Sequence, residues 1–212
     1  MKITSIEKNK KNRDMLSVYI DGKFAFTISE SNFLSMNLYD DLDLSEEKID
    51  YIKNTLNFLE AKDKAIRFLT MKLRTEKEVR DKLRESGYDN NCIEMVINEL
   101  KAIGYINNKL YAQKYIYDRA KLKPQSKKMM KRQLLLKGIS EDIADEVLKD
   151  WKVDDLTVAR SLVKRKFGKY EMSDEKVRRK AQSFLIYRGF STGTIKEALR
   201  DLAEDESGQD GG

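Results

Sequence analysis

The side chains that could do chemistry in this sequence are mostly lysines and arginines, and they gather in its second half. The stretch from Lys121 to Lys137 holds seven basic residues and no acidic residue. Four of them repeat at a spacing of four, which places them on one face of a helix: Lys127, Lys128, Lys131 and Arg132. Met130 and Leu134 would point to the core, so the sequence predicts an exposed basic face.

A second basic cluster lies farther along the chain and consists of Lys164, Arg165, Lys176, Arg178, Arg179 and Lys180. The last four residues fall in one predicted helix, and the first two end the helix before it. Mixed lysine and arginine can neutralise phosphates or an acidic protein surface, but they do not by themselves specify bases. The competing interpretation is a solvated, lysine-rich surface without a partner.

The residues that most enzymatic mechanisms need are missing. The chain has no histidine, which excludes an imidazole base and a histidine metal ligand. Its single cysteine, Cys92, cannot form an internal disulfide or a multi-thiolate zinc site. No GxxxxGK[ST] phosphate-binding loop is present. We therefore predict a protein that is not an enzyme and has no catalytic residue, cofactor or metal.

Two weaker signals have simpler interpretations. The aspartates of residues 40–43 could bind a hard cation, but they lack the glycine and closing glutamate of an EF-hand, which favours a solvated loop. Tyr111, Tyr115 and Tyr117 could stack on bases. Their spacings of two and four are more typical of core and boundary positions on a helix.

The composition describes a charged chain with a basic centre. The 212 residues are 37% charged and 40% hydrophobic, and the net charge is +6. Residues 109–152 hold 12 basic and 6 acidic side chains, so this segment alone carries +6. Such a centre favours a polyanionic partner, either nucleic acid or an acidic protein surface.

Several features predict a cytoplasmic, monomeric protein without membrane contact. No apolar run approaches the roughly 18 residues that a membrane-spanning helix needs. The N-terminal residues lack the apolar region of a signal peptide. A single cysteine is typical of a reducing compartment.

A repeat of 51 residues organises the chain from residue 61 onward. Gly87, Gly138 and Gly189 are separated by 51 positions each. A leucine lies four positions before each glycine, and an aromatic or aliphatic residue follows each one. Agreement at so many positions with a fixed period indicates tandem structural units.

Each unit is predicted to contain three helices. In the first unit, residues 61–73 form an amphipathic helix, and Thr75 begins a second helix in a capping box. Gly87 ends that helix in the left-handed conformation, and Asn90 or Asn91 begins the third. Short helices are marginal alone, so each unit must close a core of its own. Three such units in a row predict an elongated, curved array.

The first sixty residues predict a different structure. Residues 15–20 and 24–28 are apolar and aromatic runs that meet at the Asp-Gly pair of residues 21–22, which is typical of a hairpin with a type I′ turn. Residues 3–6 could add a third strand. Ser45 precedes a helix with two glutamates in its first turn.

The predicted fold is therefore mostly α: three tandem three-helix repeats preceded by a small N-terminal β-hairpin module. The predicted segments are a β-hairpin and helix module at residues 1–60, repeats at residues 61–108, 109–152 and 153–203, and an acidic disordered tail at residues 204–212.

Three runs of residues carry a resemblance to a known family. They are residues 72–83 with Gly87-Tyr88 and Gly104-Tyr105-Ile106, Lys123-Pro124 with Leu136-Lys137-Gly138-Ile139, and residues 176–185 with Arg188-Gly189-Phe190. These runs resemble the three repeats of the RecX regulatory proteins, and the hairpin module resembles the N-terminal extension of the longer members. The resemblance covers nearly all of residues 1–200.

The resemblance implies a modulator of the RecA recombinase. RecX proteins bind the RecA–DNA filament, lie in its helical groove, and inhibit ATP hydrolysis and strand exchange or change filament length. For this chain the resemblance implies the RecA filament as partner, with single- or double-stranded DNA as a further contact. We expect repeats two and three to supply the electrostatic contact and the hairpin module to add a further grip.

Two positions depart from the family pattern. Asn107-Asn108 stands where members often carry an aspartate pair, and Gln125-Ser126 stands where a glycine often follows the proline. Both pairs lie near predicted helix starts, so they bear on local helix capping rather than on membership of the family.

Two other functions stay open at this point. The first is a helix-turn-helix or nonspecific DNA-binding protein that acts without RecA, although no dimerisation element or recognition helix is visible. The second is a hydrolase or nuclease, which would need a pair of carboxylates that no repeat visibly builds.

Overall fold

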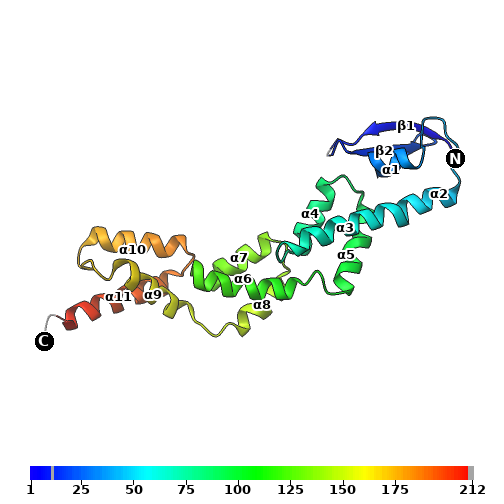
Figure 1. The fold of residues 1–212 in the computed structure, drawn as a ribbon. Coiled ribbons are helices and arrows are strands. Elements are labelled where there is room, and N and C mark those ends of the chain that lie inside the picture. The colour runs from blue at the N-terminus through cyan, green and yellow to red at the C-terminus, as the bar shows by residue number, and fades with distance from the viewer. Residues whose placement is uncertain (11, 210–212) are drawn as a thin grey trace. The chain divides into compact units, whose positions relative to one another are not determined.

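The computed structural model describes residues 1–10 and 12–209, with side chains to residue 203 (Figure 1). The chain divides into two compact units, Met1–Asn108 and Lys109–Gly212. No helix among the described residues is long and apolar enough to cross a membrane.

The first unit begins with a three-stranded antiparallel sheet in the order β1-β2-β3 (Figure 1). The strands are β1 (Ile3–Lys8), β2 (Met15–Ile20) and β3 (Lys23–Ser29). Asp21 and Gly22 connect β2 to β3 with φ angles of 48° and 78°, as a type I′ turn requires. The predicted hairpin and its third strand are confirmed.

Short helices close the core of this sheet. Ser29 caps α1 (Glu30–Ser35) by accepting a hydrogen bond from the Asn32 backbone N–H. Phe26 on β3 is fully buried, and Ile52 on the helix facing the sheet is fully buried as well. The sheet therefore has its own hydrophobic core rather than serving as a surface extension.

One continuous helical segment leads from the sheet into the first repeat. It consists of α2 (Glu46–Tyr51), a π-helical turn η1 (Ile52–Leu56) and α3 (Asn57–Thr70). The two helices predicted on either side of residue 60 form one continuous segment in the structure. Neither glycine nor proline interrupts the backbone there, so the helix that Ser45 caps continues past that position.

The first repeat consists of α3, α4 (Glu76–Glu85) and α5 (Asn90–Ala102). Thr75 and Glu78 form the predicted capping box at the start of α4, with hydrogen bonds of 3.0 and 3.1 Å. Gly87 follows α4 with a φ of 93°, as predicted. Asp89 caps α5, so the helix begins one residue after the cap, at Asn90.

The sheet packs directly on the glycine turn of the first repeat. Met15 of β2 belongs to the hydrophobic core of this repeat. A Cβ atom added at Gly87 would lie 2.8 Å from Met15 Cγ. The Asn12 side-chain amide donates a hydrogen bond of 3.0 Å to the Ser86 carbonyl. Gly87 therefore supplies a positive φ and also the space that the sheet needs.

The second unit contains the other two repeats. The second repeat consists of α6 (Asn108–Leu122, which begins at the last residue of the first unit), α7 (Lys127–Leu136) and α8 (Glu141–Asp150). The third repeat consists of α9 (Asp155–Phe167), α10 (Glu175–Tyr187) and α11 (Thr192–Gln209). Each repeat closes its own core, around Leu134 and Leu185 respectively.

The glycine turn of the third repeat packs on the second repeat. The Ser126 hydroxyl donates a hydrogen bond of 2.7 Å to the Gly189 carbonyl. A Cβ atom at Gly189 would lie 2.8 Å from Ser126 Oγ and 2.9 Å from Met129 Cβ. Within the second unit, this contact fixes the end of α10 against the start of α7.

The structure confirms the predicted fold class: three three-helix repeats and a small N-terminal antiparallel sheet. The domain boundaries and the curved array stay predictions. The predicted disordered tail differs in part, since the backbone of residues 204–209 continues α11 as a helix. Residues 210–212, the rest of that tail, lie outside the described residues.

We predict that Gly87→Ala destabilises the first unit more than Gly104→Ala does. Gly104 also has a positive φ, 80°, but nothing lies within 4 Å of an added Cβ, so its substitution should cost about 1–2 kcal/mol of left-handed strain. At position 87 the collision of the added methyl group with Met15 should cost about 1–3 kcal/mol more. Urea unfolding followed by circular dichroism measures both. In a Met15→Ala background, which is itself destabilised by the loss of a core side chain, Gly87→Ala should cost about as much as Gly104→Ala does. Equal losses at the two glycines would contradict the close packing.

Candidate partner-binding face

The first basic helix, α7, is oriented by its cap and its core residues. Ser126 accepts a hydrogen bond of 3.1 Å from the Met129 backbone N–H, which sets the first turn. Met130 and Leu134 are buried, as predicted. Lys128 and Arg132 are therefore exposed on the opposite side, and neither makes an ion pair within the described part of the chain.

The other two predicted residues of α7 have structural contacts. Lys131 Nζ lies 2.7 Å from a carboxylate oxygen of Glu141 and 2.7 Å from one of Asp145, both on α8. The hydrogen bonds that it donates to Asp145 and Glu141 raise the pKa of Lys131. Lys127 Nζ donates a hydrogen bond of 2.8 Å to the Trp151 carbonyl. The positive charge available to a partner on α7 therefore comes mainly from Lys128 and Arg132.

The predicted residues of the third repeat are all exposed: Lys164, Arg165, Lys176, Arg178, Arg179 and Lys180. Within α10, Arg179 pairs with Glu175 at 2.5 Å, and both side chains are largely exposed. Such exposed pairs contribute little and exchange readily with other partners. The Lys176, Arg178 and Lys180 side chains make no ion pair among the residues the structure describes.

A shallow hollow lies between the end of α9 and the adjacent part of α10. Lys166, Phe167, Arg179, Lys180 and Ser183 line it. The Lys166 ammonium lies 4.1 Å from the centre of the Phe184 ring, a cation–π contact. The structure thus brings Lys166, rather than Lys164 or Arg165, into this cluster with the basic residues of α10.

A similar hollow lies on α7 and combines charge with exposed apolar side chains. Lys128, Lys131, Arg132, Leu135 and Leu136 line it. Leu135 is 41% exposed and Leu136 is 67% exposed. The hollow therefore combines cations with two adjacent, exposed leucines in one small surface.

The repeat register places a second apolar pair at the same positions of α10. A shift of 51 residues takes Leu135 and Leu136 to Ile186 and Tyr187, which are 54% and 84% exposed. We did not identify these residues from the sequence. The signal was present, because they fall where an amphipathic helix should carry polar residues.

The described residues contain no group of three or more metal-ligating side chains of the His, Cys, Asp and Glu types. Cys92 is buried, and burial, with smaller contributions from Asp89 and Glu60, raises the pKa of its thiol to about 12. The thiolate is the reactive form of cysteine, so this thiol is chemically quiet near neutral pH.

Comparison with known proteins matches four segments to RecX family models. Residues 1–45 match the Regulatory protein RecX N-terminal domain. Residues 61–100, 107–148 and 153–199 match the first, second and third three-helix domains of RecX. This chain belongs to the RecX family.

Individual relatives agree with this assignment. A protein named Regulatory protein RecX from Clostridium acetobutylicum is 32% identical over 215 residues, which cover 97% of this chain and 98% of that protein. A Regulatory protein RecX from Clostridium perfringens strain 13 is 32% identical over 209 residues, with the same coverage. By name these relatives are regulatory proteins rather than enzymes.

Solved RecX structures share the fold. The crystal structure of RecX from Lactobacillus salivarius has a TM-score of 0.60 and 26% identity, covering 69% of this chain and 96% of that one. A crystal structure described as regulatory protein RecX has a TM-score of 0.62 and covers 94% of this chain and 98% of that one. At 24% identity, the second comparison supports the fold alone.

The two departures from the RecX pattern have structural roles here. Asn108 Oδ1 accepts a hydrogen bond of 3.0 Å from the Glu76 backbone N–H at the start of α4. At the start of α7, Asp155 Oδ1 of α9 accepts a similar bond of 2.8 Å from the Lys127 backbone N–H. An amide oxygen therefore replaces a carboxylate without loss of the contact. At the other departure, Ser126 supplies the cap of α7.

We predict that Cys92 of this RecX protein resists alkylation. At pH 8 the folded protein should react with iodoacetamide far more slowly than the urea-unfolded chain, whose thiol has a pKa of about 8.5. Because the folded-state pKa is raised, the stabilising effect of the neutral thiol is complete below about pH 8.5 and is lost as the pH rises toward 12. Mass spectrometry of labelled samples measures the rates. Equal rates in both states would contradict the burial.

Proposed function

We propose that this chain binds the RecA–DNA filament in its helical groove and inhibits ATP hydrolysis and strand exchange by RecA. Membership of the RecX family supports a regulatory role. The proposal assigns the contact to α7 and α10 of the second unit, with the N-terminal sheet adding a further grip. It places the protein in the cytoplasm as a monomer that acts in recombination and DNA repair.

The observation that carries the proposal is the repeated pairing of cations with exposed apolar residues. On α7, Lys128 and Arg132 line a hollow with Leu136. On α10, exposed Tyr187 follows the basic residues of the same helix. Cations alone are enough to bind phosphates, whereas an exposed tyrosine beside arginine is typical of a protein–protein contact.

The charge pattern fits a partner that presents both acidic protein and nucleic acid. Lys176, Arg178 and Lys180 are exposed and are free to pair with carboxylates or phosphates. Such pairs steer association and weaken as salt rises. The apolar residues depend much less on salt, so filament binding should decline with salt but persist when naked-DNA binding is lost.

The test is binding of fluorescently labelled chain to RecA filaments of its own species, assembled on single-stranded DNA with a nonhydrolysable ATP analogue. We expect Lys128→Glu/Arg132→Glu and Leu136→Ser/Tyr187→Ser each to weaken binding at least tenfold, a loss of about 1.4 kcal/mol. Lys127 and Lys131 are left unchanged because their contacts hold α7 against Trp151 and α8.

The matched control is Lys149→Glu/Lys152→Glu, which changes the net charge equally at exposed positions outside both hollows. It should bind as the unmodified chain does. If the control loses as much affinity as Lys128→Glu/Arg132→Glu does, net charge alone accounts for the loss and the assigned face is wrong. Salt-sensitive binding to naked DNA with no preference for RecA filaments would instead favour a DNA-binding protein that acts independently.

A further inference from the structure

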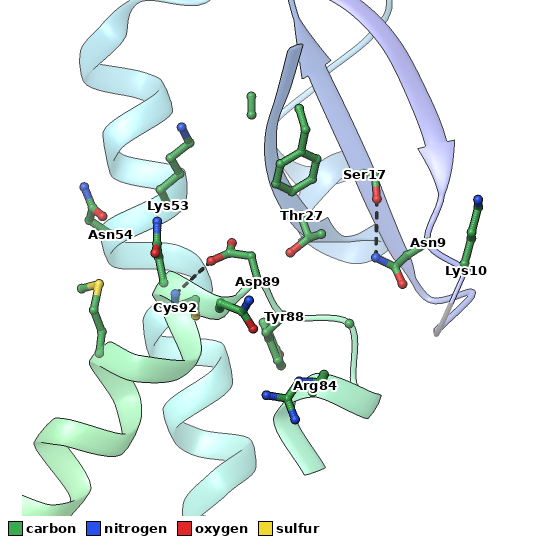
Figure 2. A pocket seen from close by; sticks show the side chains of 16 residues that line it. Asn9, Lys10, Ser17, Thr27, Lys53, Asn54, Arg84, Tyr88, Asp89 and Cys92 are labelled. Atoms are coloured by element: carbon green, nitrogen blue, oxygen red, sulfur yellow. Dashed lines mark hydrogen bonds between the residues drawn. The ribbon is translucent and has the colours of Figure 1, made fainter. Parts of the chain in front are cut away.

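A cleft of about 660 Å³ lies within the first unit, between the sheet and the helices beside it. Figure 2 shows Thr27 on the sheet side, Lys53 and Asn54 on the helix that faces the sheet, and Asp89 at the start of α5. The volume is typical of a small-molecule site. The basic face of α7 and α10 belongs to the other unit, so the proposed filament contact does not explain this cleft.

The cleft walls contain buried hydroxyl groups without partners. Thr27 is 3% exposed, and its hydroxyl makes no hydrogen bond among the described residues, although its carbonyl accepts one from Asn57. Tyr88 is 4% exposed, and its hydroxyl also makes no hydrogen bond among the described residues. Buried polar groups are nearly always hydrogen-bonded, so these two hydroxyls mark a wall of the cleft that lacks polar partners among the described residues.

The π-helical turn η1 supplies one side of the cleft. Lys53 and Asn54 both belong to this turn, and both line the cleft. A π-helical turn within an α-helix breaks the regular hydrogen-bond pattern and often occurs at functional sites. Lys53 makes no ion pair in the part of the chain that the structure describes, so its charge is available to a ligand.

The first turn of α5 adds a second positive element. Asn90 and Asn91 are exposed and line the cleft. Asp89, the carboxylate there, already accepts a hydrogen bond of 2.9 Å from the Cys92 backbone N–H. The helix N-terminus and Lys53 together favour an anion over a cation or a neutral ligand.

The mouth of the cleft carries an aromatic ring and amide groups. Phe24 is 50% exposed, and its ring packs edge-on against Tyr19 at 6.0 Å between ring centres. An exposed ring can stack on a nucleobase, and asparagine amides can both donate to and accept from base edges. An acidic peptide would satisfy the positive charge and could pair with the amides, but its backbone and carboxylates offer no flat ring for Phe24 to stack on.

We propose that this cleft binds a nucleotide, with its phosphate at Lys53 and the first turn of α5 and its base against Phe24. The ligand is either a free mononucleotide or a nucleotide unit of a nucleic-acid strand, since both present the same base and phosphate. The cleft lies beside the N-terminal sheet, to which the proposed function assigns an additional grip on the filament. Nucleotide binding is measured without RecA, so its failure and the failure of the proposed function are distinguishable.

The test is calorimetric titration of the full chain with deoxyadenosine monophosphate. Saturable binding is expected, and Lys53→Glu, Asn91→Ala and Phe24→Ala should each weaken it at least tenfold. Matched controls lie outside the cleft: Lys48→Glu on the same helical segment and Asn98→Ala two turns along α5. These should change the affinity less than twofold. Thermal melts establish that each variant folds. If the Lys53→Glu variant does not fold, Lys53→Gln is used in its place.

Competition distinguishes the two sources of the nucleotide. Displacement of the monophosphate by a 15-residue oligodeoxythymidylate identifies a nucleic-acid strand as the ligand. Displacement by neither the oligonucleotide nor hexaglutamate identifies a free nucleotide, and both results support the proposal. Four results would overturn it: no saturable binding of the monophosphate at millimolar concentration, inorganic phosphate binding equally well, losses in the controls equal to those in the cleft variants, or displacement by hexaglutamate but not by the oligonucleotide, which would identify an acidic peptide.

Discussion

Each three-helix repeat depends on the glycine that ends its second helix. Gly87, Gly138 and Gly189 all adopt left-handed backbone angles, with φ of 93°, 81° and 83°, which cost little only for glycine. The turn sends the next residue back into the core, where Tyr88 and its equivalents Ile139 and Phe190 are buried. Because this anchor fixes the rotation of the second helix, it also decides which of that helix's side chains face solvent.

In the first and third repeats, the same turn also packs against a neighbouring element of its own unit. Gly87 accommodates Met15 of the sheet, and Gly189 accommodates Ser126 and Met129 at the start of α7. The glycine turn therefore closes the core of the repeat and orients the exposed face of its second helix. Because glycine has no side chain, the turn also leaves room for the adjoining element. The proposed partner contact uses the basic and apolar side chains of α7 and α10 that this arrangement leaves exposed.

The elements that the sequence predicted correctly are those specified by local chemistry. The capping box at Thr75, the type I′ turn at residues 21–22 and the repeated glycines each depend on neighbouring residues alone. What the sequence could not show depends on distant contacts. Lys131 looked free until α8 brought Glu141 beside it, and the cleft beside Thr27 exists only because the sheet packs on the first repeat. The apolar pair at Leu135 and Leu136 was visible in the repeat alignment but was not recognised as exposed.

The central claim is that this RecX family member restrains RecA on DNA. Its most direct test is the rate of single-stranded-DNA-dependent ATP hydrolysis by RecA of the same species, measured as increasing amounts of this chain are added. Groove occupancy predicts that hydrolysis falls steadily and is suppressed only near one copy per RecA. Suppression well below that ratio would indicate control through filament ends or disassembly rather than groove binding. An unchanged rate, with DNA binding by the chain intact, would contradict the account.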